Sequence, residues 1–368
     1  MASVKSEKIT GENKVIRSYM IDMIIMLSVT VVVAVYTYGI RALESTLLSV
    51  FAAVATEAVS YLLFMHKKPE RLTDLSAIFT GMAIALALPS SAPLFMAPLG
   101  SIVAIAVAKI PFGNAKSVPF VPAAVGLAFL TICYPDVVFK YPSLSVGDLG
   151  VSSMSEEFIQ GTSLAQMLSQ SKSIGTGVLY ALDVFVGRVP GPMGASCLIL
   201  MLGILVYMII RRQPGLITTV SFIAACGVMA VLFPRVLTGR TYSLLMELSS
   251  GLLLYSAVFF ISDPVTSPKN QVGKVLYGAV AGIITMLLRY FGAFEESVCF
   301  VVIMMNSVST AFDKLGVRFS EKPDRTSSHR VERRTKRKAA TEKVSVEDAE
   351  ILEESDTPST DGGASEDE

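Results

Sequence analysis

The sequence predicts an all-α integral membrane protein with about ten transmembrane helices, arranged as two inverted five-helix repeats that contain short or broken helices. Three observations lead to this fold class. Hydrophobic residues make up 52% of the 368 residues and gather in repeated runs close to the length of a membrane span. Charged residues are only 17% of the total and avoid most of residues 18–315. Two polar, proline-bounded segments interrupt the runs at matching places in the two halves.

Ten apolar runs are predicted to cross the membrane. They cover residues 18–37, 40–65, 76–89, 93–110, 118–134, 192–210, 215–233, 243–261, 272–289 and 297–313. The third run is too short to cross a bilayer as a straight helix, which is typical of broken helices in transporters. The predicted segments are an N-terminal segment (1–17), a first membrane repeat (18–134), a long loop (135–191), a second membrane repeat (192–313) and a tail (314–368).

Basic residues set the predicted orientation, because cytoplasmic loops are enriched in lysine and arginine. The N-terminal segment, the tail and the loops after even-numbered spans carry most of the basic residues. Lys109 is counted with such an inner loop. The outer loops carry mainly acidic residues, Glu296 among them, with Arg235 and Arg240 as exceptions. Both termini are therefore predicted to be cytoplasmic, and the loop 135–191 extracytoplasmic.

The tail after residue 314 has a basic half followed by an acidic half. Such a segment buries too little apolar surface to fold, so we expect disorder. Its basic half suits either anionic lipid or cytoplasmic partner subunits.

Two segments of matching pattern indicate the inverted repeat. Pro89-Ser90-Ser91-Ala92-Pro93 and Pro264-Val265-Thr266-Ser267-Pro268 each place three residues, hydroxyl-bearing ones among them, between two prolines. Phe112-Gly113 and the following Ser117–Val121 likewise match Phe291-Gly292 and Ser297–Val301. The alternative is convergent turn chemistry. In inverted-repeat transporters such breaks meet near the midplane and line a ligand or ion route.

Four residues are candidates for an ion pathway or a central polar site: Glu57, Asp263, Thr266 and Ser267. A carboxylate within a membrane span is costly, so Glu57 is predicted to titrate or to meet a cation. The alternatives are a snorkelling or helix-packing carboxylate for Glu57 and an ordinary Asp-Pro turn for residues 262–268.

The chain offers little for other kinds of chemistry. Its four cysteines lie singly in apolar runs, and its two histidines lie at a membrane edge and in the tail. These positions argue against a disulfide framework, a haem, a metal site or an iron–sulfur cysteine set. We find no catalytic nucleophile–base pair, so redox work would fall to a bound cofactor.

Several stretches carry a family resemblance. They are Leu72-Thr73-Asp74-Leu75-Ser76 with Leu86-Ala87-Leu88-Pro89, then Pro119-Phe120-Val121-Pro122-Ala123, Pro190-Gly191-Pro192-Met193-Gly194-Ala195-Ser196, and Asp263-Pro264-Val265-Thr266-Ser267-Pro268. Together they resemble the D subunit of the Rnf ion-translocating electron-transport complex (the RnfD/NqrB family), which is similar to the B subunit of the sodium-pumping NADH:quinone reductase. The chain departs from the family at Pro119 and Val121, usually asparagines, and at Ala195-Ser196, usually Glu-Thr. It also lacks the extra N-terminal segment of the quinone-reductase protein, which favours the Rnf assignment.

The resemblance implies flavin mononucleotide (FMN) esterified through its phosphate to a threonine in the loop before the sixth span. The family pattern Asp-x-x-Ser-Gly-Ala-Thr corresponds here to Glu156–Thr162, so Thr162 is the expected attachment site. Ile159 and Gln160 stand where the family has Ser-Gly, and Thr176 is the rival acceptor. A second, non-covalent flavin such as riboflavin is also compatible with the family.

The resemblance implies a flavin-carrying membrane subunit that couples electron transfer between ferredoxin and NAD to sodium or proton translocation in the inner membrane of a prokaryote. Its partners would be membrane, flavin and iron–sulfur subunits of one complex, including an extracytoplasmic covalent-flavin subunit, and the lipid bilayer, with no nucleic acid. We expect the redox state of the flavin to bias a rocking of the two repeats around the breaks. The alternatives are a stand-alone small-solute channel or transporter, a part of a sodium-pumping quinone reductase, and a structural scaffold subunit.

Overall fold

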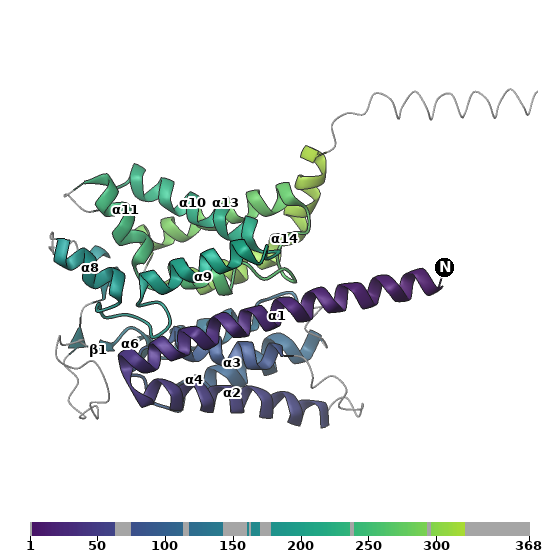
Figure 1. Ribbon diagram of the computed structural model, residues 1–368, viewed down its shortest axis with the longest axis horizontal. Coiled ribbons are helices and arrows are strands. Elements are labelled where there is room, and N and C mark those ends of the chain that lie inside the picture. The colour runs from purple at the N-terminus through teal and green to yellow at the C-terminus, as the bar shows by residue number, and fades with distance from the viewer. Residues whose placement is uncertain are drawn as a thin grey trace, which may run out of the picture. The chain divides into compact units, whose positions relative to one another are not determined.

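The computed structural model describes residues 2–62, 75–112, 118–142, 160–161, 163–169, 178–235, 239–292 and 296–320. This part of the chain is almost entirely helical (Figure 1). Nearly all of it belongs to one compact unit, Met1–Val317. The structure therefore agrees with the predicted all-α membrane class, with the addition of two very short strands.

The first half contains the elements α1 to α6. They are α1 (Ala2–Tyr38), α2 (Ile40–Ser60), α3 (Ser76–Ala87), α4 (Met96–Val103) continued by a π-helical turn η3 (Ala104–Lys109) and a 3₁₀ turn η4 (Ile110–Phe112), α5 (Pro122–Cys133) and α6 (Pro135–Val138). The sequence explains the limits of the two short helices. Pro89 follows the end of α3, and Pro122 occupies the first turn of α5, where its missing N–H group costs nothing.

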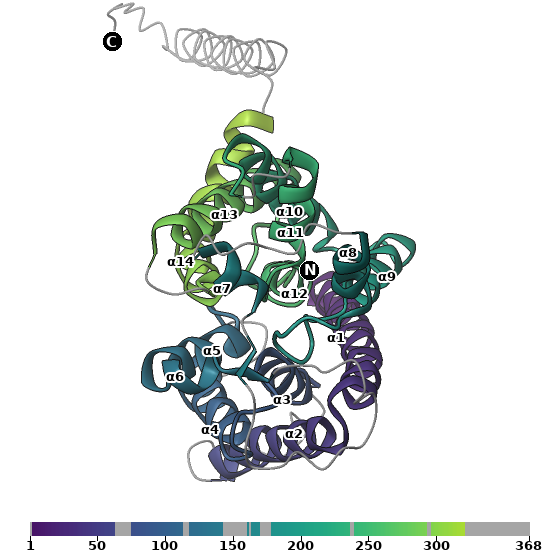
Figure 2. The same ribbon diagram turned by 90° about the vertical axis from the view of Figure 1, so that its left-hand side faces the viewer.

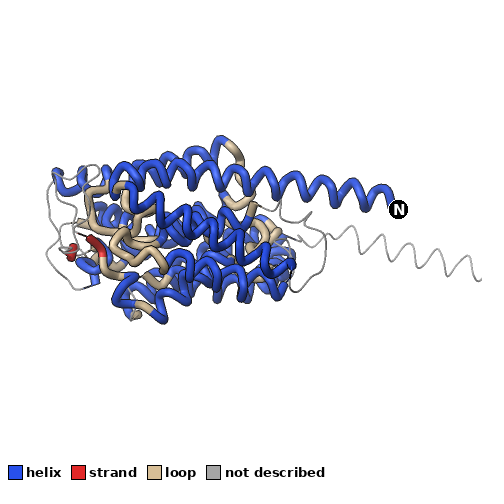
Figure 3. The backbone as a smooth tube through the Cα atoms, turned by 90° about the horizontal axis from the view of Figure 1, so that it is seen from below, coloured by secondary structure: helices blue, strands red, loops and turns tan. Residues whose placement is uncertain are grey.

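The second half contains the longer helices α13 and α14. Its elements are β1 (Tyr141–Pro142), β2 (Gln160–Gly161), α7 (Leu164–Ser169), α8 (Val178–Val186), α9 (Leu198–Ile210), α10 (Leu216–Leu232), α11 (Arg240–Ser249), α12 (Leu253–Phe259), α13 (Gln271–Phe291) and α14 (Val298–Ser320), the strands and α7 belonging to the connecting region. The strands pair antiparallel, with Tyr141 opposite Gly161. Figure 3 shows this pair at the end of the bundle away from the N-terminus.

Four of the described helices are long and apolar enough to cross a membrane. They are Arg17–Tyr38, Ile40–Ser60, Gln271–Phe291 and Val298–Phe319, and a fifth span results if α11 and α12, bent by 57° at their junction, are counted together. Five shorter apolar helices accompany them. Each of the ten predicted runs contains one or more of these helices. The helix α1 begins at Ala2, within the predicted N-terminal segment, and α14 continues to Ser320, past the predicted start of the tail.

Helices of the two halves gather in two groups. In Figure 2, α2, α3, α4 and α5 lie together in the lower part, whereas α10, α11, α13 and α14 lie together in the upper part. Large apolar side chains are exposed on the outside of both groups, including Val32, Phe51, Ile210, Leu232 and Phe291. An exposed apolar surface of this extent suits contact with lipid.

Glycines allow close packing between α10 and α13. A Cβ atom on Gly278 would lie 2.5 Å from the carbonyl oxygen of Thr218, and one on Gly282 would lie 2.7 Å from that of Phe222. Small residues that bring two helix backbones together are typical of membrane helix interfaces, where burial from water provides no driving force.

Helix α1 is bound to the second half at three levels along its length. Asp22 accepts hydrogen bonds from Arg211 (2.9 Å) and Gln213 (2.5 Å). The Tyr19 hydroxyl lies 3.3 Å from Ser262 Oγ, and the Tyr38 hydroxyl lies 2.5 Å from Ser196 Oγ. The first helix of the chain is therefore shared between the two groups.

Candidate functional site

Two cavities lie inside the bundle, and each has charged side chains in its wall. The first, called here the Lys109 cavity, has a volume of about 30 Å³, and the second, the Glu296 cavity, about 10 Å³. The Lys109 cavity is lined by Tyr19, Met20, Ser76, Phe79, Thr80, Lys109, Val118, Phe120, Val121, Pro122 and Asp263. The Glu296 cavity is lined by Ala87, Leu127, Thr131, Val138, Phe139, Tyr141, Leu252, Glu296, Val298 and Cys299.

A buried ion pair lies at the Lys109 cavity. Lys109 Nζ donates to Glu57 Oε1 at 2.6 Å and to Ser76 Oγ at 2.6 Å, and the two charged side chains are at most 5% exposed. Ser76 begins α3, so the contacts join α2, η3 and α3. Glu57 therefore does not snorkel to an interface. Lys109, which sequence analysis counted as a loop charge, is the buried partner of Glu57. It is buried because the helix of the fourth apolar run continues beyond α4 as η3, which ends at Lys109.

The break at residues 262–268 brings Asp263 to the same cavity. Asp263 Oδ1 accepts from the backbone N–H of Val265 at 3.2 Å, and Oδ2 accepts from Thr266 Oγ1 at 3.3 Å. The predicted non-helical break is confirmed, and it is also the Asp-Pro turn given as the alternative. Thr266 and Ser267 are buried but are not among the residues that line the cavity. Of the four predicted central residues, the structure thus brings Asp263 and, through Lys109, Glu57 together.

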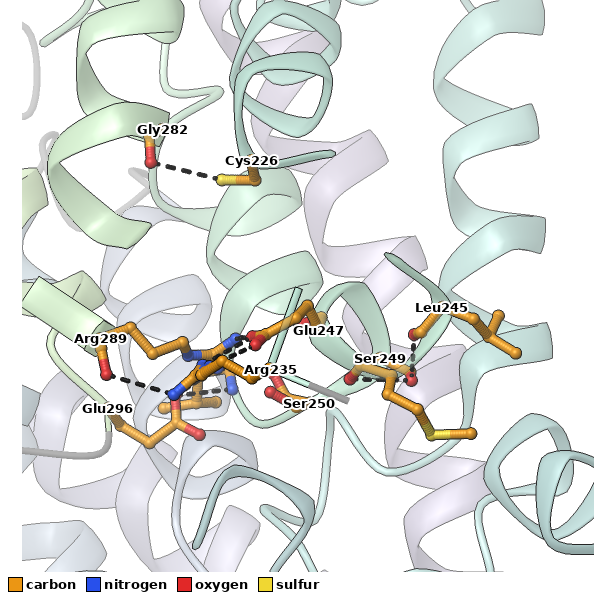
Figure 4. Close-up of polar contacts among 11 residues, drawn as sticks. Cys226, Arg235, Leu245, Glu247, Ser249, Ser250, Gly282, Arg289 and Glu296 are labelled. Carbon is orange, nitrogen blue, oxygen red and sulfur yellow. Dashed lines mark hydrogen bonds and ion pairs between the residues drawn. The ribbon is translucent and has the colours of Figure 1, made fainter. Parts of the chain in front are cut away.

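A second buried charge network occupies the α11–α12 junction (Figure 4). Arg235 donates to both oxygens of Glu247, with Nε–Oε1 at 2.6 Å and Nη2–Oε2 at 2.8 Å. Arg289 lies 3.7 Å from Glu247 Oε2 and 3.7 Å from Glu296 Oε2. The guanidinium of Arg235 also stacks 4.5 Å from the Tyr290 ring centroid. Glu247 is completely buried.

The charges of this network are opposite in sign to the partial charges of the two helix ends at the junction. At the end of α11, Arg289 donates to the carbonyl oxygen of Glu247 (3.1 Å), which also accepts from the N–H of Ser250 (3.3 Å), and to the carbonyl oxygen of Ser250 (2.8 Å). Glu296 Oε2 accepts from the N–H of Leu252, just before α12, at 2.9 Å. Gly251 (φ 59°) permits this approach, because a Cβ atom there would lie 1.4 Å from Glu296 Oε1. Cation and anion thus each stabilise the helix end of opposite partial charge.

The predicted flavin acceptor Thr162 lies outside the described residues, as does its rival Thr176. The described neighbours of Thr162 are anchored on both sides. Gln160 and Gly161 pair with β1, and after Ser163, which is buried, α7 packs through Leu164 and Leu168 in a cluster with Met246 of α11. β1 also contributes Tyr141 to the wall of the Glu296 cavity. The strand before the expected attachment site therefore pairs with β1, a strand that contributes to this cavity, and the helix after the site packs against α11.

The family-like segment at residues 190–196 caps α3. The N–H groups of Met193 and Gly194 donate to the carbonyl oxygens of Leu88 (3.1 Å) and Leu86 (2.7 Å). Ser196, which stands where the family usually has a polar Glu-Thr pair, bonds to Tyr38. The segment between the long loop and α9 is thus bound to the short helix that borders both cavities.

Sequence reasoning missed Lys109, Arg289 and Glu296 as buried functional candidates. Each lies at or just beyond the edge of an apolar run, where a charge ordinarily reaches water, and each has at least one partner more than 40 residues away in the sequence. The matching positions of Lys109 and Arg289 near the end of the fourth run of each half could have served as a signal. In the described part of the chain no group of three or more His, Cys, Asp or Glu side chains is arranged to hold a metal ion.

These features define an integral, multi-pass α-helical membrane protein that encloses charged groups at its helix breaks. The chain belongs to the NQR2, RnfD, RnfE family, whose sequence model matches residues 3–319. The predicted family is thereby confirmed.

Three relatives show what the chain is similar to. The D subunit of the proton-translocating ferredoxin:NAD(+) oxidoreductase complex of Clostridium ljungdahlii is 31% identical over 288 residues, 77% of this chain and 85% of the relative. The D subunit of the Na(+)-translocating ferredoxin:NAD(+) oxidoreductase complex of Acetobacterium woodii is 29% identical over 301 residues, 81% and 88% of the two chains. The D subunit of the ion-translocating oxidoreductase complex of Stutzerimonas stutzeri is 30% identical over 323 residues, 80% and 89%.

Proposed function

We propose that this chain is the membrane-embedded D subunit of an Rnf-type complex that couples electron transfer between ferredoxin and NAD to movement of sodium ions or protons. The observation that carries the proposal is the family match, which extends over almost the whole helical part of the chain. The relatives are named as subunits of complexes with this activity, one for protons and another for sodium ions. Carboxylates and hydroxyls in the cavities suit both ions, so the proposal covers both.

The buried charges support a role in ion movement. Ionisable groups inside a membrane protein are costly and commonly mark ion pathways. Here two cavities carry such groups, and residues of both halves contribute to each: Asp263 reaches the Lys109 cavity, and Leu127 of α5 borders the Glu296 cavity. A rocking of one half against the other would change access to these groups, as in transporters with inverted repeats.

Ten spans and an inverted repeat are part of the proposal. In each half a basic residue near the end of the fourth span contacts a serine that lies at the start of a short helix or three residues before it. Lys109 bonds to Ser76 Oγ, and Arg289 bonds to the carbonyl oxygen of Ser250. Both serines lie beside a buried glutamate, and both short helices run into a proline-bounded turn. These parallels favour one architecture used twice, with the termini on the cytoplasmic side of a prokaryotic inner membrane.

The flavin belongs to the proposal through Thr162. The donor chemistry is suitable, because the attachment requires only a hydroxyl group on an accessible segment, and the anchored neighbours Gly161 and Ser163 would hold that segment in place. When bound, FMN would supply the electron-transfer chemistry for which protein side chains have no equivalent. The role of the chain is then to hold the Thr162 hydroxyl between Gly161, which pairs with β1, and Ser163, which precedes α7. Binding of a second, non-covalent flavin such as riboflavin is a separate part of the proposal.

The function can be tested by deletion and co-purification. We expect membranes from cells without this chain to lose ferredoxin-dependent NAD reduction, and a plasmid copy to restore it. An affinity-tagged chain should co-purify with flavin and iron–sulfur subunits. A chain that purifies alone from membranes that keep the activity would contradict the proposal and favour a stand-alone transporter. Co-purification with a quinone-reducing activity in place of NAD reduction would favour the related sodium-pumping complex.

The flavin attachment predicts a specific loss of fluorescence. The denatured wild-type chain should fluoresce under ultraviolet light in a gel, because a phosphoester-linked flavin stays on the protein. Thr162→Val should abolish the signal, and Thr176→Val should retain it as the matched control in the same loop. Fluorescence that persists in Thr162→Val would rule out this attachment site. A dark wild-type chain in an active complex would favour a scaffold role for the subunit.

A further inference from the structure

We propose that the Glu296 cavity is the outward vestibule of the cation route and that Glu296 is the carboxylate that binds a monovalent cation there. This inference rests on the proposed function in ion translocation. It assigns a site and a residue that the match to the family does not provide. Three features support it: the position of the cavity, the hydrogen bonds of Glu296 and the surroundings of its carboxylate.

The two cavities lie at opposite ends of the same pair of helices. Ser76 and Thr80, in the first turns of α3, line the Lys109 cavity, whereas Ala87, the last residue of α3, lines the Glu296 cavity. On α5 the order is the same, with Pro122 at the first cavity and Thr131 at the second. If the Lys109 cavity opens to the cytoplasmic side, the Glu296 cavity opens to the other side.

The barrier between the cavities is thin. Thr80 and Ala87 are seven residues apart, which corresponds to roughly 10 Å along an α-helix. Between them Ala83, Ile84 and Ala85 are completely buried, so the helix is tightly packed in this interval. A separation of about two helical turns is small compared with a hydrocarbon core of roughly 30 Å. A modest shift of α3 against its neighbours would therefore connect the two cavities.

Glu296 differs from the other carboxylates of the network in its hydrogen bonding. Both oxygens of Glu247 are bonded to Arg235. Of the Glu296 oxygens, Oε2 accepts from Leu252 N–H, whereas Oε1 is buried and has no hydrogen-bond partner in the described part of the chain. Buried polar atoms are ordinarily bonded, so a buried carboxylate oxygen without a partner, on a residue that lines the cavity, is free to bind a cation.

Two further oxygens without partners among the described residues lie close to Glu296 in the chain fold. Ser297 Oγ belongs to the next residue, and Ser250 Oγ belongs to the residue before Gly251, against which Glu296 Oε1 packs. A carboxylate and hydroxyl oxygens are ligands that a hard monovalent cation accepts. Arg289 forms an ion pair with Oε2 at 3.7 Å and is also held by two carbonyl oxygens, so a cation at Oε1 would bind beside a guanidinium, which lowers its affinity. Weak binding of this kind favours release.

The inference predicts separate effects on transport and on access. In vesicles that contain the whole complex, Glu296→Gln should lower ferredoxin-driven uptake of sodium ions or protons about tenfold or more and shift its dependence on cation concentration. Glu296→Asp should restore part of the rate. Glutamine keeps an oxygen for Leu252 N–H, so the helix junction should survive. Asp183→Asn, an exposed carboxylate on α8, is the control and should transport like the wild type.

Access to the cavity gives a second, independent measurement. In a complex in which the other three cysteines of this chain are replaced, Cys299 should react with a membrane-impermeant thiol reagent from the extracytoplasmic side, and Ser76→Cys should react only from the cytoplasmic side. Normal transport by Glu296→Gln, or a Cys299 that reacts from neither side, would overturn the inference while leaving the proposed function intact. Reaction of Cys299 only after Thr162→Val would also overturn it, because a flavin ring would then fill the cavity. If the wild-type complex shows no ferredoxin-driven transport, the proposed function itself is contradicted.

Discussion

Replacement of Arg289 with methionine is expected to destabilise the protein by about 3–5 kcal/mol, because removal of one partner of a buried ion pair leaves uncompensated charge in the interior. The Arg289 guanidinium is 3% exposed and contacts two carboxylates and two carbonyl oxygens. Methionine of similar length fills the volume but removes the two guanidinium donors at the end of α11. Thermal unfolding of the purified protein in detergent should show a clearly lowered midpoint.

The comparison with Arg188 makes this prediction specific. Arg188 lies 4.0 Å from Asp183, and both side chains are at least 40% exposed. Arg188→Met should leave the unfolding midpoint nearly unchanged, since exposed pairs contribute little. Arg289→Lys should restore only part of the stability, because one ammonium group cannot bond to both sides of the junction at once. Equal midpoints for Arg289→Met and Arg188→Met would show that the network does not stabilise the fold.

Neutralisation of Glu57 is expected to have the second large effect, on transport and on stability together. Glu57→Gln removes the charge 2.6 Å from Lys109 Nζ and leaves the buried ammonium poorly compensated, at a cost of about 3 kcal/mol or more. Ion uptake into vesicles should fall more strongly than complex assembly, as judged by co-purification of the other subunits. The double variant Glu57→Gln/Lys109→Met separates the two effects.

In the double variant no unpaired charge remains from this ion pair, so stability should return toward the wild-type value. Ion uptake should stay low, because the charges of the pair are gone. If the double variant transports ions at the wild-type rate, the pair is structural only. If Glu57→Gln and Lys109→Met are each as stable as the wild type, this ion pair does not stabilise the fold, although its side chains are only 4–5% exposed.

The helical membrane class could be read from the sequence because hydrophobic runs and segregated charges are local properties. The break at residues 262–268 was also predictable, since two prolines forbid a helix there. What the sequence did not reveal was the burial of Lys109 and Glu296. Hydropathy places a charge at the end of an apolar run in water, whereas here the partner Glu57 lies 52 residues from Lys109 and Leu252 lies 44 residues from Glu296.

The short helices explain a further difference. α11 and α12 form one apolar run, but the junction at Ser250–Leu252 divides it and bends it by 57°. The only local sign of the junction is Ser249-Ser250-Gly251, and small residues within an apolar run are equally common in unbroken membrane helices. Arg289 of α13 and Glu296 supply the charges that stabilise the junction, so the position of the bend depends on tertiary contacts.

The attachment of α1 to the second half has a consequence for how the chain is made. Tyr19 bonds to a residue 243 positions later, Asp22 to residues at least 185 positions later, and Tyr38 to one 158 positions later. At a synthesis rate of roughly 5–20 residues per second, these partners emerge tens of seconds or less after α1 does. During that interval the polar groups of α1 must remain hydrated, be bound by another protein or lie at the membrane surface. Completion of the fold therefore waits for the last third of the chain, and truncated products would retain an incompletely docked first helix.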